Sequence, residues 1–560
     1  MYQSFRQSMS WLHTWFGLVM GYVLMVAFFF GALSVFDREI DRWAIPATRF
    51  EAQVMPSFDQ RLKPIFEQMK PDEHELEHAR ERVGGPLEAT LPLMNWSAYT
   101  THRDPVLGMY AEYAVRNNPD DPLDHVHGYI TIDPRTGQQL PHDQLKIGSE
   151  FFYPLHFSLH VEWRSLGYWI VAFAALVMLA ALVSGVVMHR KFFREFFTFR
   201  PEKATQRRTL DLHNLTGVVA LPFHFIFALS GLTIFASIYL PVGETMLEKQ
   251  ALSHFQEADR AKGLATEPSG KAAPLASVDA MVVEAKRRWA ARDMPGEVGF
   301  LYINHVGDAA SYVSIYRAGS DRVALVGQAI HFEGATGRVI VEEPPPGAAS
   351  RVNEFLTGLH LQHFKHWLLR WFYVLGGLAG CVCIATGFIF FVEKRKRQHA
   401  RAGVSGARWV DAFAVTTVTG MLIATAGMLL VNRLLPADIS ARATWEEGAF
   451  WTAWSLTLVH ALWRSAPVQA ARLSPAWREQ SWVFALFAVS AVIANWITTG
   501  DHLVKTLAEG YWPVAGLDLA LLVSAGIAAA SALSLKRRES RVPAESTAAT
   551  ALETAGVANV

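Results

Sequence analysis

Long apolar runs constrain the fold of this 560-residue chain more than any other feature of its sequence. A helix needs about 20 mostly apolar residues to cross the hydrocarbon core of a bilayer. We predict eight such helices, at residues 11–36, 166–189, 212–240, 367–392, 409–431, 448–463, 480–498 and 513–535. The chain is therefore expected to be an all-α polytopic membrane bundle surrounded by membrane lipid.

Lysine and arginine residues gather in every second connector between these predicted helices. The basic connectors are 190–208, 394–397, 464–478 and the tail at 536–538. Because basic connectors stay on the cytoplasmic side of a membrane, this alternation places both termini in the cytoplasm and predicts a protein of the bacterial inner membrane. The first apolar run is too long for a signal-peptide core and has no small-residue cleavage site after it, so we expect it to be retained.

The charge balance and the cysteines exclude several classes of function. The chain has 51 basic and 51 acidic residues, so nothing suggests the concentrated basic face that nucleic acid requires as a partner. Its two cysteines, Cys381 and Cys383, lie inside an apolar run, and no C-x-x-C-H motif occurs. Covalent c-type haem and thiolate metal clusters are therefore excluded, and a redox cofactor would have to be held by histidine.

Two long polar connectors are predicted to lie outside the membrane, at 38–155 and 241–355. Each contains a strand-turn-strand pattern, at 128–137 and 328–337, and each is large enough to form a small α+β domain. The expected division is 1–37 first transmembrane helix, 38–155 external domain, 156–240 second and third helices with a basic loop, 241–355 second external domain, 356–397 fourth helix, 408–538 four C-terminal helices and 539–560 disordered tail.

An offset of 200 residues superposes the first half of residues 1–397 on the second. The matching pairs are Leu12-His13 and Leu212-His213, Gly17 and Gly217, Gly31 and Gly231, Ile130 and Ile330, Thr136-Gly137 and Thr336-Gly337, and Leu159-His160 and Leu359-His360. Each half is therefore predicted to be a repeat of helix, external domain and helix. A pseudo-two-fold axis along the membrane normal would bring His13 opposite His213 at the inner face, and His160 opposite His360 at the outer face.

Opposed imidazoles of this kind fill both axial positions of a low-spin haem iron. We therefore predict two non-covalent b-type haems, one held by His13 and His213 and the other by His160 and His360. Hydrogen bonding between the repeats, without a cofactor, is the structural alternative. No catalytic side chain is assigned.

Five other histidines are reserve ligands. His156 precedes His160 by one turn, and His363 and His366 follow His360, although a solvated side chain is the simplest interpretation of each. His189, at the inner end of the second predicted helix, could replace an inner ligand. His224, beside Pro222 in the third predicted helix, should face the bundle interior, where it would support redox or proton transfer or bond to a carbonyl freed by Pro222.

Several of these motifs resemble those of the PepSY-associated transmembrane family. The resemblance covers residues 1–397 and is carried by Leu12-His13-x-x-x-Gly17, its copy at 212–217, Asp133-Pro-x-Thr-Gly137 and Leu359-His360, whereas the second turn, Glu333-Gly-Ala-Thr-Gly337, departs from the pattern. The family includes di-haem inner-membrane reductases of ferric siderophores. The resemblance therefore implies PepSY-like periplasmic domains, haem and a role in iron acquisition.

The function that this resemblance implies is electron transfer from a quinol or a cytoplasmic donor to a periplasmic ferric siderophore, which releases the iron. Two alternatives remain open: a transporter of iron or siderophore, which should show discontinuous helices in the membrane, and a regulatory or peptide-binding PepSY protein without haem. Distance is an obstacle to electron transfer, because the 29 residues from His160 to His189 span about 43 Å as a helix.

Overall fold

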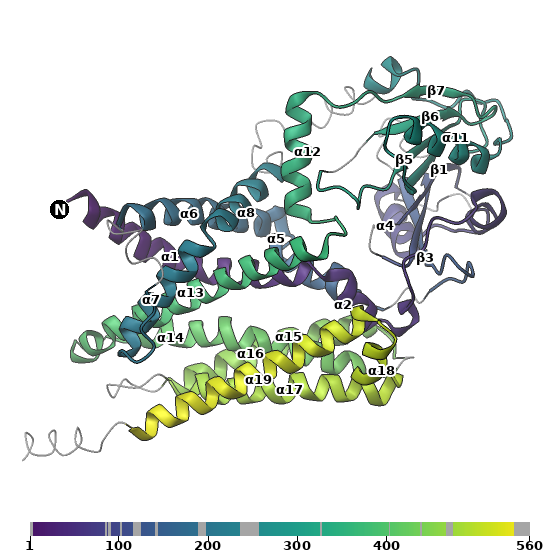
Figure 1. Ribbon diagram of the computed structural model, residues 1–560. Helices are drawn as coiled ribbons and strands as arrows, with labels where there is room; N and C mark the ends of the chain where they lie inside the picture. The colour runs from purple at the N-terminus through teal and green to yellow at the C-terminus, as the bar shows by residue number, and fades with distance from the viewer. Residues whose placement is uncertain are drawn as a thin grey trace, which may run out of the picture. The chain divides into compact units, whose positions relative to one another are not determined.

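The computed structural model describes residues 4–541 except 85–86, 88–90, 101–103, 116–124, 141–143, 189–197, 236–256, 325–327, 403, 437–438 and 466–473 (Figure 1). The chain forms two compact units. The helical unit comprises Met1–Pro46, Leu145–Ile226 and Tyr373–Val560, and the sheet unit comprises Ala47–Gln144 and Phe227–Phe372. The chain therefore leaves the helical unit twice, at the two connectors that the sequence predicts to lie outside the membrane.

Six helices in the described part of the chain are long and apolar enough to cross a membrane. They are α1 (Phe5–Ser34), α6 (Leu166–Met188) with the preceding turn η4 (Trp163–Ser165), α13 (Trp367–Arg401), the continuous stretch α14 (Gly406–Val415), η5 (Thr416–Gly420) and α15 (Met421–Leu434), α17 (Pro475–Thr499) and α19 (Trp512–Arg541). The chain is therefore a multi-pass membrane protein.

The two other predicted spans differ from straight apolar helices. α16 (Arg442–Arg464) is helical where the shortest span was predicted, but its first turns carry Arg442, Glu446 and Glu447, and it falls short of the apolarity of the six. The third predicted span is a pair of helices, α7 (Thr205–Val219) and α8 (Leu221–Ile234), bent by 62° at Ala220. Counting the pair once makes up to seven spans, so the number eight stays a prediction.

The bend has a local cause in the sequence. Pro222 lies in the first turn of α8, where its missing N–H is not needed for an intrahelical hydrogen bond. In an uninterrupted helix the same proline would remove a hydrogen bond and clash with the preceding turn. Starting a new helix just before Pro222 avoids both costs.

Glycines bring α13 and α1 into close contact in the helical unit. A Cβ atom at Gly380 would lie 2.6 Å from the ring of Phe28, and one at Gly377 would lie 3.0 Å from Ala32. Missing side chains at these positions allow the helix backbones to approach. The same core continues into the C-terminal helices, since Phe30 of α1 contacts Phe450 of α16 with ring centroids 6.0 Å apart.

The sheet unit contains one antiparallel sheet to which both long connectors contribute. Its strands are β1 (Leu93–Tyr99), β2 (Leu107–Ala114), β3 (His125–Ile132), β4 (Val298–Asn304), β5 (Tyr312–Arg317), β6 (Ala329–Glu333) and β7 (Val339–Glu342). The strand order is β3-β2-β1-β4-β5-β6-β7. Pairing of Trp96 with Ile303 and of Tyr99 with Phe300 joins β1 to β4. The segments that the sequence predicts to be two external domains therefore share a continuous sheet.

Both predicted turns of the connectors are present. Gly137 and Gly337 have φ values of +77° and +74°, in the left-handed region that favours glycine. Their N–H groups donate to the carbonyl oxygens of Asp133 and Glu333, at 2.7 and 2.8 Å. The strand-turn-strand prediction is confirmed for the second connector, where β6 and β7 flank the turn, whereas in the first connector β3 and the turn are followed by a single bridge between Ile132 and Gln139. Replacing Asp-Pro by Glu-Gly keeps the hydrogen bond that the glycine of the turn donates.

The remaining elements are short or cover the sheet. They are α2 (Asp37–Ala44), η1 (Pro46–Thr48), η2 (Phe58–Leu62), α3 (Lys63–Phe66), α4 (Glu73–Val83), η3 (Ile147–Phe152), α5 (Tyr153–Phe157), α11 (Val278–Ala291), α12 (Ala348–Leu361) and α18 (Leu503–Ala508). Phe58, Met281 and Trp289 pack with Trp96 and Leu301 of the strands to form a single hydrophobic core. One core shared by both connectors explains why they fold as one unit.

Candidate functional site

The structure brings together the first predicted pair of histidines, both of which lie in the helical unit. His13 of α1 and His213 of α7 have ring centroids 6.0 Å apart and ring planes at 86°. Two imidazoles that bind one metal ion from opposite sides, each at about 2 Å, have ring centroids about 6 Å apart. The spacing of this pair therefore fits two axial ligands of one haem iron.

Hydrogen bonds orient both rings in the same way. His13 donates from Nδ1 to the carbonyl oxygen of Ala181 at 3.0 Å, and His213 donates from Nδ1 to that of Cys383 at 2.7 Å. Because a carbonyl oxygen can only accept, Nδ1 must carry the proton, and in the neutral ring Nε2 carries the lone pair. A metal-binding histidine is commonly fixed in this tautomer by such a bond.

Each of these rings also lies over a glycine of the second helix of its repeat. A Cβ atom at Gly185 would lie 3.4 Å from His13, and one at Gly387 would lie 3.4 Å from His213. In both cases the glycine follows the accepting carbonyl by four residues, so the two environments match closely. Gly17, one turn after His13, has open space where a side chain would be.

A related environment occurs at the other end of α1, where it surrounds His156. The ring of His156 donates from Nδ1 to the carbonyl oxygen of Ala27 at 2.7 Å. A Cβ atom at Gly31 would lie 2.7 Å from the same Nδ1. His156 is therefore held against the first helix of its repeat by one carbonyl and one glycine.

His360 has the corresponding environment in the sheet unit. Its Nδ1 lies 2.8 Å from Oγ of Ser230, and a Cβ atom at Gly231 would lie 3.0 Å from its ring. Gly31 and Gly231 are equivalent positions of the repeat. The structure therefore places His156 in the first repeat where it places His360 in the second.

His160, the outer ligand predicted for the first repeat, has a different environment. Its Nε2 bonds to the carbonyl oxygen of Phe151 at 2.8 Å, and its ring stacks on Phe151 at 4.7 Å. Its backbone is left-handed, with φ of +53°. His156 follows Gly31 by 125 residues, whereas His360 follows Gly231 by 129 residues. Because the two separations differ by four residues, a constant offset of 200 pairs His360 with His160 instead of His156.

The other reserve histidines do not join either pair in the described structure. His224 is 3% exposed, and its Nε2 lies 3.2 Å from the carbonyl oxygen of Gly376 in α13, which is not a carbonyl that Pro222 frees. His363 and His366 are exposed, and Nδ1 of His366 accepts a bond from the backbone N–H of Leu369 at the start of α13. His189 lies outside the described residues.

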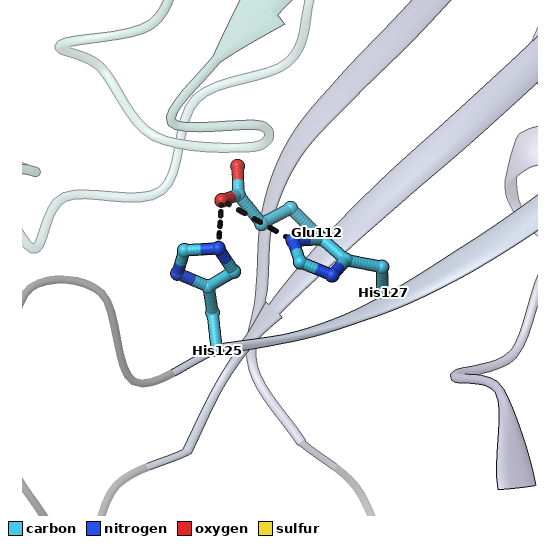
Figure 2. A group of neighbouring side chains, drawn as sticks. All are labelled: Glu112, His125 and His127. Atoms are coloured by element: carbon cyan, nitrogen blue, oxygen red, sulfur yellow. Dashed lines mark ion pairs between the residues drawn. The ribbon is translucent and has the colours of Figure 1, made fainter. Parts of the chain in front are cut away.

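One cluster of possible metal ligands was not predicted from the sequence. Glu112 of β2 and His125 and His127 of β3 bring three ligand atoms within 4.8 Å of one another (Figure 2). The detectable signal was His-x-His in a segment of alternating residues, which puts both imidazoles on one face of a strand. The carboxylate could not be found in that way, because it comes from the neighbouring strand.

Comparison with known proteins agrees with the membrane helices. The family described as "PepSY-associated TM region" matches residues 10–394. An uncharacterized protein of Pseudomonas aeruginosa is 26% identical in an alignment of 392 residues, which covers 66% of this chain and 90% of that protein. The family match includes both repeats and His13, His213, His156 and His360. The chain therefore belongs to the family of the PepSY-associated TM region.

Proposed function

We propose that this protein is a haem-containing reductase of the bacterial inner membrane, which passes electrons across the membrane to a ferric siderophore. The observation that carries the proposal is the pair His13 and His213, with ring centroids 6.0 Å apart. Haem would supply reversible one-electron chemistry. The protein would supply the ligands, their orientation and a site from which bulk water is excluded.

The first haem is assigned to His13 and His213, both oriented by backbone carbonyls through Nδ1. For the second haem we propose His156 as the ligand from the first repeat in place of His160, because the environment of His156 within the helical unit matches that of His360 within the sheet unit. The support is that each ring is held through Nδ1 and packs on an equivalent glycine, Gly31 or Gly231. His160 uses Nε2, the nitrogen that a ligand oriented like His13 would present to iron, to bind Phe151.

This assignment shortens the distance that an electron would cover. Gly31, which His156 contacts, follows His13 by 18 residues on α1, or about 27 Å along the helix axis. The corresponding estimate from His160 and His189 was about 43 Å. His224 and Phe28 contact each other between these two levels, with ring centroids 5.1 Å apart.

The substrate class rests on the family resemblance. Iron(III) bound to hard oxygen chelators is held far more tightly than iron(II), so accepting one electron would release the iron. A quinol or a cytoplasmic reductant would be the donor, with both termini in the cytoplasm. The C-terminal helices α14–α19 are compatible with a donor site but receive no assigned role.

An absorption spectrum of the detergent-purified full chain tests the proposal. We expect sharp b-type bands in the reduced-minus-oxidised spectrum and two haems per chain in a pyridine haemochrome assay. Oxidation of the dithionite-reduced protein by a ferric siderophore should be observable at the same bands. A well-folded protein without haem, purified from haem-sufficient cells, would overturn the proposal and favour the regulatory or peptide-binding alternative.

One observation favours a transporter as the second candidate. The 62° break between α7 and α8, next to Pro222, is the discontinuous helix that such a protein is expected to show. Protein reconstituted into liposomes separates the two functions. Accumulation of the intact ferric chelate inside liposomes would support transport, whereas reduction of the chelate without its accumulation supports the reductase.

A further inference from the structure

The cluster of Glu112, His125 and His127 in the sheet unit has the geometry of a small metal site. Nε2 of His125 lies 3.1 Å from Oε1 of Glu112, and Nε2 of His127 lies 3.9 Å from the same oxygen. Ligand atoms of a tetrahedral site with bonds of about 2.0–2.1 Å are about 3.3 Å apart. Figure 2 shows the two rings directed toward the one carboxylate. A small movement of the His127 ring toward Glu112 would shorten the distance of 3.9 Å and bring its Nε2 to the spacing of metal ligands.

Antiparallel pairing of β2 and β3 produces the arrangement. Glu112 lies directly opposite His127 across the two strands, and His125 precedes His127 by two residues. Residues two apart on a strand share a face, so all three side chains project from the same side. Strand β3 lies at the edge of the sheet, and the side chains of His125 and His127 are 18% and 22% exposed. An ion could therefore enter from solvent and keep water ligands.

Neighbouring groups orient two of the three ligands. Nδ1 of His127 lies 2.9 Å from Oε2 of Glu75 on α4, so it carries the proton and leaves the Nε2 lone pair facing the cluster. The amide of Asn95 donates to Oε2 of Glu112, which leaves Oε1 facing the histidines. Supporting hydrogen bonds of this kind are typical around metal ligands.

Electrostatics also favours a cation. Within the described structure, Glu75 and Glu112 form ion pairs with histidines and with no lysine or arginine. The carboxylates of Glu75 and Glu112 lie on either side of His127, at 2.9 and 3.9 Å from its ring nitrogens, and ionised carboxylates can only accept hydrogen bonds. A divalent cation at the centre would compensate this charge.

We propose that Nε2 of His125, Nε2 of His127 and Oε1 of Glu112 bind a divalent transition-metal ion. Two imidazoles and one carboxylate suit Zn²⁺ or Fe²⁺ better than Ca²⁺ or Mg²⁺, which prefer oxygen ligands only. The three protein ligands leave positions open to water or an exogenous ligand. The proposal is independent of haem and of the reductase activity.

Zn²⁺ binding by the full chain in detergent tests the proposal, because zinc is distinguishable from haem iron by mass spectrometry of the metals. After treatment with a chelator and equilibrium dialysis against micromolar Zn²⁺, we expect one more bound zinc per chain in the wild type than in His125→Ala/His127→Ala. Glu75→Gln should keep the site but weaken its affinity about 10- to 100-fold. Glu112→Gln, which preserves side-chain size, should also lose the zinc.

His74→Ala/His78→Ala is the matched control. These two histidines of α4 have ring centroids 4.5 Å apart and could bind zinc as an exposed pair. The control should retain the additional zinc. Equal zinc content in the wild type and in both cluster variants would overturn the proposal, as would loss of the zinc in the control alone. Zn²⁺ should raise the unfolding temperature of the wild type but not of Glu112→Gln, which provides a second readout if the double variant folds poorly.

Discussion

Asp59 and Asp279 each cap the helical turn that contains the other. The carboxylate of Asp59 accepts from the backbone N–H groups of Val278 and Asp279, at 3.1 and 3.2 Å. The carboxylate of Asp279 accepts from those of Phe58 and Asp59, at 2.7 and 3.4 Å. This exchange links the two connectors next to the core that their strands share, to which Phe58 and Val278 belong.

Replacing Asp59 or Asp279 by alanine should destabilise the sheet unit by about 1–2 kcal/mol, because each change leaves helix N-terminal N–H groups without acceptors. The double variant should cost less than the sum, since the two caps share residues. Denaturant unfolding of the full chain measures the effect. Glu267→Ala, at an exposed position, is the control. Unchanged midpoints in both single variants would show that the exchanged caps do not stabilise the unit.

His13→Ala and His213→Ala should each remove one haem of two, because one imidazole cannot complete a bis-histidine site. The pyridine haemochrome assay should fall by about half in each variant. His366→Ala, which changes an exposed histidine at the start of α13, should retain both haems. Full haem content in both His13→Ala and His213→Ala would contradict the assignment of this pair.

His156→Ala should remove the other haem, whereas His160→Ala should retain it. The physical reason is that Nδ1 of His156 is held by Ala27, while Nε2 of His160 is held by Phe151. Spectra of the two purified variants make the comparison directly. The opposite result would restore His160 as the ligand, as the offset of 200 predicts.

Gly31→Ala should reduce haem content, because the new Cβ atom would lie 2.7 Å from Nδ1 of His156 and displace the ring. Val19→Ala, at an exposed position of the same helix, is the control and should be tolerated. The ratio of haem absorbance to protein absorbance checks both. Similar losses in the two variants would indicate a general effect on α1 instead of contact with His156.

Glu343 should make the stability of the sheet unit depend on pH. Burial raises the pKa of Glu343, but hydrogen bonds from His331, Lys262 and the N–H of Ala329 outweigh burial and lower it to about 2. The ionised carboxylate therefore stabilises the fold above its ordinary pKa of 4.5, and this contribution is lost as the pH falls from about 4.5 toward 2. Glu343→Gln should lose about 2 kcal/mol at pH 6 and show a smaller further loss at pH 3. Thermal unfolding at both pH values gives the comparison, and parallel losses in the two proteins would exclude Glu343 as the source.

Local patterns in the sequence were sufficient for six of the eight predicted membrane helices and for the turns at Gly137 and Gly337, and the internal repeat was sufficient for the pairing of His13 with His213. Apolar run length and a glycine in the left-handed region depend on neighbouring residues, so they can be identified without a structure. His13 and His213 were identifiable because the same motif, Leu-His-x-x-x-Gly, occurs in both copies of the first helix at an offset of 200 residues.

Tertiary structure decided the features that depend on contacts between distant residues. The pairing of β1 with β4 makes one sheet from two connectors, and the strand register places Glu112 beside His127. Connectors of unequal length shift the equivalence from His160 to His156, which only the contact with Gly31 reveals. The sequence by itself therefore determined six membrane helices, whose signals are local, and the pair of His13 and His213, which the internal repeat connects. Packing and register decided the contact of His156 with Gly31 and the cluster of Glu112, His125 and His127, because these bring together side chains that no sequence period connects.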